Sequence, residues 1–385
     1  MSGKPIRTFA VALLAAALHA QSPGSAALAQ TSASSQIDSV FAPLAQGKSP
    51  GMAVLVRQEG RTVFQRGYGV RDLGTSRKID AVTDFRLASF TKQFTSMAVM
   101  LLVHDGKLRY DEALTGVFPG FPEYARAITL RHLLTHTSGL GDYEDAMDAR
   151  AWTPDHQIQD EDVLALLQRQ TAPKFAAGKS WAYSNSAYVV LGLIVAKASG
   201  EPFEQFLQER IFRPLGMTKT LAYRKGRNTV PNRAFGHSKK SGGFVETDQS
   251  STSATLGDGG VYSNLADLAK WDAALQNHTL LGEQEMSAAL TPVRLADGGA
   301  PNWPAAPGDD NLNPGKPVAY GFGWFLDPYQ GRPRMWHSGS TQGFRTAIER
   351  FPAEKLTVIV LANRTDLDAA ALALQVADLF HKSAN

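Results

Sequence analysis

The most constraining feature of the sequence is the tetrapeptide SFTK, Ser89 to Lys92, which stands directly before a mostly apolar stretch at 93–103. Such a stretch predicts a buried helix, and residues three apart on a helix lie on neighbouring faces. The amine of Lys92 can therefore reach the hydroxyl of Ser89. A neutral, desolvated lysine is a base, and a serine beside a base is a nucleophile. The helix N-terminus adds a partial positive charge that favours a developing oxyanion.

The first thirty residues differ in composition from the rest of the chain. Lys4 and Arg7 precede an apolar run at 9–18, and 27–29 (Ala-Leu-Ala) places small residues at the spacing that signal peptidase recognises. The run is too short to span a bilayer, which favours a cleaved export signal at 1–29 over a membrane anchor. We therefore expect a periplasmic or secreted protein with no stable membrane anchor after cleavage.

Charge and cysteine usage exclude several classes of protein. Removal of 1–29 takes away two basic side chains and no acid, which leaves a net charge of about +1 and no electrostatic footprint for nucleic acid. The chain has no cysteine, hence no disulfide and no thiol nucleophile. For the export signal, a second possible signal-peptidase cleavage site, after Ala20, fits less well than the site after Ala29, because Leu18 is large.

Strand patterns occur at both ends of the chain, with helical patterns between them. Strands are expected at 51–57, 61–70, 320–326, 346–351 and 356–362, helices at 161–170, 187–198, 203–212, 266–276 and 283–290, and a closing helix at 366–381. This order predicts an α+β fold, in which one antiparallel sheet is built from both chain ends and flanked by helices. The expected hydrolase domain covers 37–382, with its sheet region at 37–103 and 251–382 and an inserted, mainly helical region at 104–250.

A second candidate motif is Tyr183-Ser184-Asn185, which lies between a turn and an apolar helix. Tyr183, as a phenolate held near a lysine, could take the proton of Ser89, and Asn185 could hydrogen-bond the lysine and a substrate amide. The structural alternative is a helix entry in which Ser184 or Asn185 caps the helix. The copy of the pattern at 262–264 is expected to be such a helix start.

A third candidate is the segment His337-Ser338-Gly339-Ser340. Its small residues would let a strand edge approach a ligand closely. His337 could donate to an anionic group, and the N–H of Ser340 could pair with that of Ser89 as an oxyanion hole. Taken alone, the segment could equally be a turn with a solvated histidine.

Together, the order SxxK, YxN, HxG resembles the serine β-lactamase and penicillin-binding protein superfamily, in its class C-like branch. The stretches 128–140 (ITLRHLLTHTSGL), 212–217 (FRPLGM) and 257–271 (GDGGVYSNLADLAKW) are similar to signatures of that family. The resemblance covers about 37–382. It implies that the chain is a serine hydrolase that acts through an acyl-enzyme and needs no metal or organic cofactor.

The resemblance assigns a role to each motif residue. Ser89 matches the acylated nucleophile, Lys92 the lysine that assists its deprotonation, and Tyr183 the general base. The matching substrate-binding positions are Asn185, His337, Ser338, Gly339 and Ser340, the last supplying an oxyanion amide together with Ser89.

One position departs from the β-lactamase pattern. Class C β-lactamases normally have lysine where this chain has His337, and histidine is more usual among carboxypeptidases, aminopeptidases and esterases. A histidine with a pKa near 6.5 holds a carboxylate less reliably than a lysine. We therefore expect a D-alanyl-D-alanine carboxypeptidase-like enzyme or an esterase, with a class C-like β-lactamase or a penicillin-binding sensor without turnover as alternatives. The expected partner is a small-molecule or peptide substrate, namely a peptidoglycan stem peptide, an ester or a β-lactam.

Two other enzyme classes are disfavoured. The GxSxG match at 47–51 fails because Pro50, directly after the serine, has no N–H for an oxyanion hole. His132 and His136 are four apart on an expected helix, but Leu133 replaces the glutamate of HExxH and no third ligand cluster is evident. Both histidines are expected to be structural. The loops at 142–159 and 297–316 are expected to form the walls that select the substrate.

Overall fold

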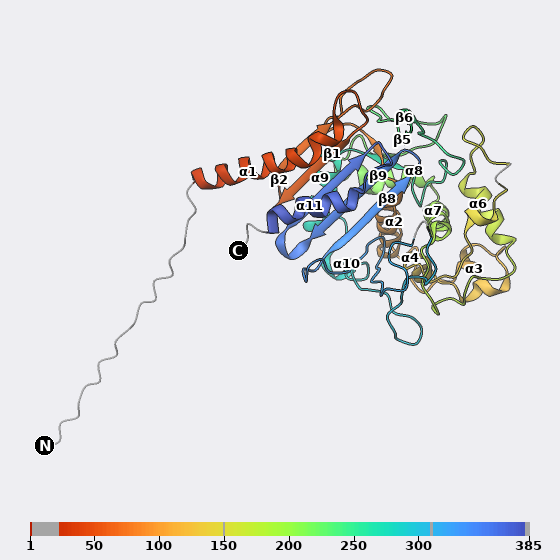
Figure 1. Ribbon diagram of the computed structural model, residues 1–385. Coiled ribbons are helices and arrows are strands. Elements are labelled where there is room, and N and C mark those ends of the chain that lie inside the picture. Colours follow the sequence, from red (N-terminus) through yellow and green to blue (C-terminus); the bar gives the residue numbers. More distant parts are fainter. Residues whose placement is uncertain (2–22, 149–150, 309–310, 382–385) are drawn as a thin grey trace.

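The centre of the molecule is a five-stranded antiparallel sheet in the order β2-β1-β10-β9-β8. The computed structural model describes residues 1, 23–148, 151–308 and 311–381. The strands of this sheet are β1 (Met52–Gln58), β2 (Arg61–Tyr68), β8 (Met335–Thr341), β9 (Phe344–Phe351) and β10 (Leu356–Ala362). Strand β1 pairs with β10 from Met52 opposite Ala362 to Gln58 opposite Leu356, so the two ends of the chain form one sheet (Figure 1). The predicted α+β fold is confirmed.

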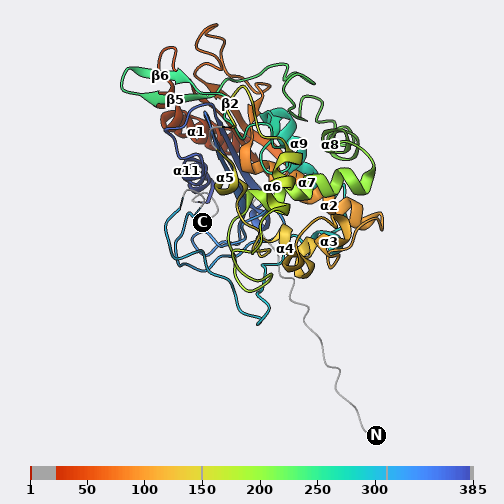
Figure 2. The same ribbon diagram turned by 90° about the vertical axis from the view of Figure 1, so that its right-hand side faces the viewer.

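Each face of the sheet is covered by a different set of helices. Helices α1 (Pro23–Phe41) and α11 (Ala369–His381) lie on one face, and the helices of the central part of the chain lie on the other (Figures 1 and 2). Successive side chains of β1 point to opposite faces of the sheet, and both faces are buried. Its Val54 and Val56 pack in the cluster under α11, whereas Ala53 and Leu55 belong to the larger core on the other side.

The larger core is built around α2 (Lys92–His104), which is buried along nearly its whole length, and α7 (Asn185–Ser199), which is buried along most of its first three turns. Both read as apolar all round, as expected for helices that are surrounded by protein. The other helices are α3 (Leu114–Val117), α4 (Leu130–Leu134), α5 (Tyr143–Ala146), α6 (Asp160–Gln168), α8 (Phe203–Leu207), α9 (Leu265–Gln276) and α10 (Glu283–Met286). Short 3-10 or π turns are η1 (Ala42–Ala45), η2 (Ala88–Thr91), η3 (Glu123–Ala127), η4 (Gln208–Phe212) and η5 (Pro352–Glu354).

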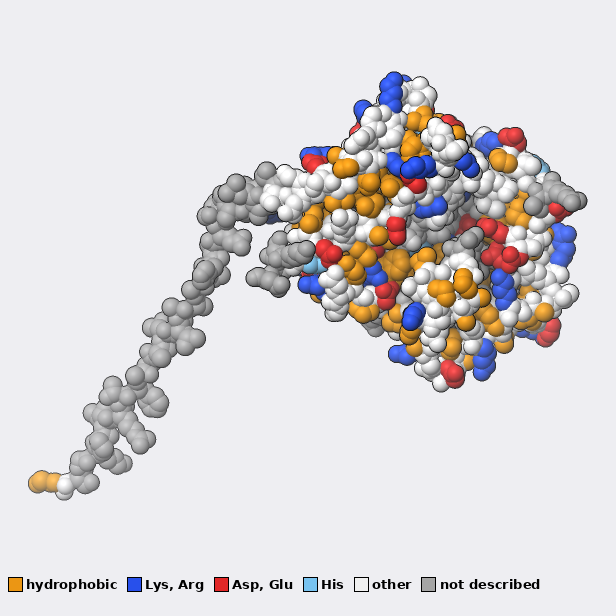
Figure 3. Space-filling model, in the orientation of Figure 1, with side chains coloured by type: hydrophobic (Ala, Val, Ile, Leu, Met, Phe, Trp, Pro, Cys, Tyr) orange, Lys and Arg blue, Asp and Glu red, His pale blue; other side chains and the backbone are white. Residues whose placement is uncertain are grey.

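Two small sheets complete the fold. One has the order β3-β7-β4 and contains β3 (Phe85–Arg86), β4 (Leu221–Ala222) and β7 (Val261–Ser263). The other pairs β5 (His237–Lys240) with β6 (Gly243–Glu246). The region 104–250, expected to be mainly helical, therefore also contains β4, β5 and β6. On the face drawn in Figure 3, basic and acidic side chains are interspersed, in keeping with the near-neutral composition.

The prediction of a strand at 320–326 is wrong. Gly323 has a φ of +75°, which interrupts an extended chain, and Gly321 packs so closely that a side chain there would collide with the carbonyl of Ala289. Only Phe325 in this stretch pairs with the main sheet, through two hydrogen bonds of 2.9 Å with the backbone of Trp336. The edge strand is instead β8, which carries the His337 motif.

The predicted export signal at 1–29 falls largely outside the described residues, which include only Met1 and 23–29 of it. Residues 23–29 form the first part of α1. Within the ranges that the structure describes, no helix is both long enough and apolar enough to cross a membrane.

Candidate active site

Ser89 lies in the turn η2, and this turn leads directly into α2. The preceding Ala88 has a φ of +51°, a left-handed conformation that is unfavourable for a residue with a side chain and that occurs mostly where the surrounding structure enforces it. Here the Thr346 hydroxyl of β9 donates to the Leu87 carbonyl at 2.7 Å, and the Thr91 hydroxyl accepts from the Val261 N–H at 3.2 Å. These contacts hold the serine turn against the five-stranded sheet and against the small β3-β7-β4 sheet.

The expected contact between lysine and serine is present. Lys92 is fully buried, and its Nζ lies 3.0 Å from Ser89 Oγ, 2.8 Å from Asn185 Oδ1 and 3.0 Å from the carbonyl oxygen of Asp258. The oxygens of Asn185 and Asp258 can only accept hydrogen bonds, so each binds one N–H of the amine. The remaining N–H or lone pair of the Lys92 nitrogen is then directed at Ser89. An ammonium would donate there, and a neutral amine would accept the serine proton. A proton can thus move between Ser89 and Lys92 while both groups remain hydrogen-bonded.

Tyr183 and Asn185 flank the start of α7, and the motif serves both structural and chemical purposes. Ser184 is the N-cap and accepts from the Ala187 N–H at 3.1 Å, which satisfies an orphan donor of the helix. Because Ser184 does the capping, the Asn185 side chain is available for Lys92. The Tyr183 ring centroid lies 4.8 Å from Lys92 Nζ. At the second copy of the pattern, Asn264 caps α9, as expected.

His136 supports the Tyr183 loop and is a neutral, structural histidine. Its Nδ1 accepts from the Ser184 N–H at 3.1 Å, and its ring packs against that of Tyr183 in a tilted arrangement, with ring centroids 4.5 Å apart. Complete burial, with Lys92 and His337 nearby, lowers the pKa of His136 well below 6.5. His132 Nδ1 accepts from the Thr129 N–H at 3.2 Å. Among the described residues, no group of three potential ligands could hold a metal ion.

The open edge of β8 faces the serine. Trp336 uses both its N–H and its C=O to bond Phe325 on the side away from β9. In an antiparallel strand, the N–H and C=O of one residue point to one side and those of the next residue to the other side. The N–H and C=O of Ser338 and Ser340 therefore point to the same side as those of Trp336, away from β9 and toward the free edge. Gly339 lies between them, where a Cβ would collide with the Leu87 carbonyl and with Thr346 Oγ1. A glycine is therefore needed for this edge to approach η2, and Ser340 lines the same cavity as Ser89.

His337 is buried in an environment that differs from that of a free histidine in water. Its Nδ1 lies 2.6 Å from the Ser338 carbonyl, so this nitrogen carries the proton, and its Nε2 lies 3.2 Å from the Tyr320 hydroxyl. Burial and the charge of Lys92 lower the pKa of His337 to about 3. The ordinary pKa near 6.5, on which the expectation from the sequence was based, therefore does not apply to His337. In this tautomer Nε2 can only accept, and it offers no N–H to a carboxylate.

The reaction cavity itself is small, with a volume of about 60 Å³. Its described lining comprises Ser89, Tyr183, Trp303, Leu312, Phe325, His337, Ser338 and Ser340. Trp303 and Leu312 come from the expected loop at 297–316, and none of these residues comes from the other expected loop at 142–159. Trp303 stacks on Phe325 with ring centroids 5.4 Å apart. Apart from the polar motifs, the described lining of the cavity is thus apolar and largely aromatic.

Four contributors escaped the sequence reasoning. Asp258 acts through its backbone carbonyl, so its side chain carries no signal, although the neighbouring glycines suggest close packing. The ring centroid of Tyr188 lies 5.4 Å from Lys92 Nζ, and Tyr188 belongs to the apolar run of α7, where a tyrosine is indistinguishable from core packing. Tyr320 and Phe325 lie in the stretch that was expected to be a regular strand.

Comparison with known proteins agrees with this geometry. The family model described as Beta-lactamase matches residues 37–380, nearly the whole described chain. The chain belongs to the beta-lactamase family. Members of this family are generally serine hydrolases. One similar relative is penicillin-binding protein 4* of Bacillus subtilis, with 30% identity over 344 residues that cover 86% of this chain and 72% of the relative.

Other similar proteins differ widely in what their names describe. Unguisins hydrolase of Aspergillus violaceofuscus is 28% identical over 85% of this chain and 60% of its own length. Among solved structures, a penicillin-binding protein from Bacillus halodurans matches with a TM-score of 0.72 and 25% identity, over 91% of this chain and 98% of that one. D-amino acid amidase from Ochrobactrum anthropi matches with a TM-score of 0.74 and 23% identity, over 92% and 99%. The last likeness shows the fold alone.

Proposed function

We propose that this protein is an exported serine hydrolase that cleaves an ester or amide through an acyl-enzyme on Ser89. The observation that carries the proposal is the position of Lys92 Nζ, 3.0 Å from Ser89 Oγ and anchored by two carbonyl acceptors. The three contacts of this buried amine suit the activation of a hydroxyl.

The reaction follows from the groups around the cavity. Ser89 Oγ attacks the substrate carbonyl while its proton passes to Tyr183, a phenolate stabilised by the Lys92 ammonium. The N–H groups of Ser89 and Ser340 donate to the oxygen that becomes negative in the tetrahedral intermediate. The C–O or C–N bond then breaks as Tyr183 returns the proton to the leaving group. Water repeats the sequence on the acyl-enzyme and releases the acid and free Ser89.

The environment of His337 favours substrates without a carboxylate at this position. D-alanyl-D-alanine peptides and β-lactams both carry a carboxylate, and a neutral imidazole with an acceptor nitrogen would repel it. None of the described residues that line the cavity is a lysine or arginine, and its far wall is apolar. We therefore propose an esterase or amidase for substrates without a carboxylate at this position, ahead of the carboxypeptidase activity that the sequence also suggested.

Matched substrates test this choice. We expect kcat/KM for a p-nitrophenyl ester or an alanine amide to exceed that for the same acyl group with a carboxylate-bearing leaving group. The test uses steady-state rates on both members of each pair, together with nitrocefin. A preference for the carboxylate member would refute the assignment of substrate class while leaving the acyl-enzyme mechanism intact.

The nucleophile is tested separately. Ser89→Ala should abolish turnover and the covalent adduct that mass spectrometry detects on the peptide that contains Ser89. A stoichiometric adduct that forms on the native chain without turnover would favour a penicillin-binding sensor instead. Export is tested by N-terminal sequencing of the protein recovered from the cell exterior or periplasm, which should begin after Ala29.

A further inference from the structure

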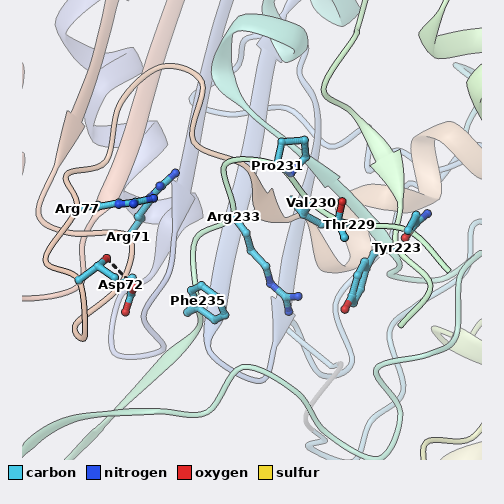
Figure 4. Close-up of a pocket in the computed structure, with 11 residues that line it drawn as sticks. Arg71, Asp72, Arg77, Tyr223, Thr229, Val230, Pro231, Arg233 and Phe235 are labelled. Carbon is cyan, nitrogen blue, oxygen red and sulfur yellow. Dashed lines mark hydrogen bonds between the residues drawn. The ribbon is translucent and has the colours of Figure 1, made fainter. Parts of the chain in front are cut away.

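A cleft separate from the reaction cavity lies between the β2–β3 connection and the segment 223–235, and has a volume of about 320 Å³ (Figure 4). None of its lining residues lines the reaction cavity. The two walls are held together by the backbone, because the Phe235 N–H donates to the Arg71 carbonyl at 2.8 Å. The volume falls in the range of small-molecule sites.

Three guanidinium groups line this cleft, and two of them are not neutralised. Arg71 and Arg77 stand on one wall, and their backbones are joined by a hydrogen bond of 2.8 Å. Within the described residues, neither forms an ion pair with a carboxylate. The one acid in the lining, Asp72, is engaged by its own loop, since it accepts from the Gly74 N–H at 2.8 Å and from the Thr75 hydroxyl at 2.6 Å.

The third guanidinium, that of Arg233, is fixed in place. It pairs with Asp248 and donates to the Tyr262 hydroxyl at 3.0 Å. Its Cζ lies 4.8 Å from the ring centroid of Tyr223 and 5.3 Å from that of Phe235, both of which line the cleft. In Figure 4 the side chain extends between these two rings. The cleft thus has a rigid aromatic and cationic wall opposite the two arginines without acid partners.

We propose that this cleft binds a small anion with two or more negatively charged oxygens, carboxylate or phosphate, joined to a flat apolar portion. Arg71 and Arg77 would pair with the charged oxygens, since guanidinium groups match both anions in bidentate geometry. Tyr223 and Phe235 would contact the apolar portion. Because Arg233 already has Asp248, the positive charge that the anion meets is that of Arg71 and Arg77, reduced by the negative charge of Asp72.

The experiment measures binding of two probes, citrate and pyrophosphate, to the full chain by isothermal titration calorimetry at low and high salt. The test variant is the double substitution Arg71→Gln with Arg77→Gln. The matched control is Lys78→Gln, which removes an exposed positive charge from the neighbouring residue outside the cleft lining. Turnover of a p-nitrophenyl ester and the thermal midpoint verify that each variant is folded.

We expect saturable binding of at least one probe, weakened at least about tenfold in the double variant and unchanged in the control. A stronger response to citrate would identify a carboxylate ligand, and a stronger response to pyrophosphate a phosphate. Absence of saturable binding to both probes overturns the proposal. So does binding that survives in the double variant, or an equal loss in the Lys78→Gln control, which would indicate general charge attraction. These results do not depend on whether Ser89 is the nucleophile.

Discussion

Gly339→Ala should damage the reaction centre by moving the edge of β8. A Cβ at this position would lie well inside 3.0 Å of the Leu87 carbonyl and of Thr346 Oγ1, and 3.1 Å from Ala88 Cβ. Backbone and a hydrogen-bonded hydroxyl surround it, so the strand must shift by about 1 Å, a misplacement that can cost about 10²-fold in rate. The shift separates the N–H of Ser340 from that of Ser89, and loss of one oxyanion donor costs about 10²- to 10³-fold in kcat.

The assay is the acylation rate of a p-nitrophenyl ester under single-turnover conditions, with the thermal midpoint measured in parallel. Overpacking of this kind also costs about 1–3 kcal/mol of stability. Gly242→Ala is the matched control, because nothing lies within 4 Å of its Cβ position and it should change neither quantity. An acylation rate for a folded Gly339→Ala protein within threefold of the native rate would refute the proposed role of the β8 edge.

Three other substitutions test the electrostatics. Lys92→Met removes the donor from three acceptors, and single-turnover kinetics should show acylation reduced by at least about 10³-fold. His337 stays neutral above its pKa of about 3, so His337→Asn should alter the rate while leaving the shape of the pH–rate profile between pH 5 and 8 unchanged. Burial raises the pKa of Glu349 to about 8. Between its ordinary pKa and pH 8, the carboxyl group of Glu349 therefore takes up a proton when the chain folds, and the native chain loses stability as pH rises toward 8. Denaturant unfolding should accordingly show that Glu349→Gln gains stability over the native chain between pH 5 and pH 8; a constant difference would contradict this.

The sequence was sufficient wherever a few neighbouring residues decide the outcome. Helical spacing alone brings Lys92 beside Ser89, and a cap followed by an apolar run defines the start of α7 with Asn185 on its first turn. The strand patterns at 51–57 and 356–362 predicted β1 and β10 nearly to the residue, because alternation and β-branched side chains are local properties. The overall arrangement of the α+β fold followed from those elements.

The tertiary structure decided what depends on distant neighbours. The stretch 320–326 has the composition of a strand, but the packing of Gly321 on Ala289 and the left-handed Gly323 bend it out of the main sheet. The protonation state of His337 is set by complete burial and by the charge of Lys92, and neither can be read from the sequence around it. Desolvation and charge act through space, so the sequence by itself determined which groups could react, and only the folded chain determined which of them carry a charge.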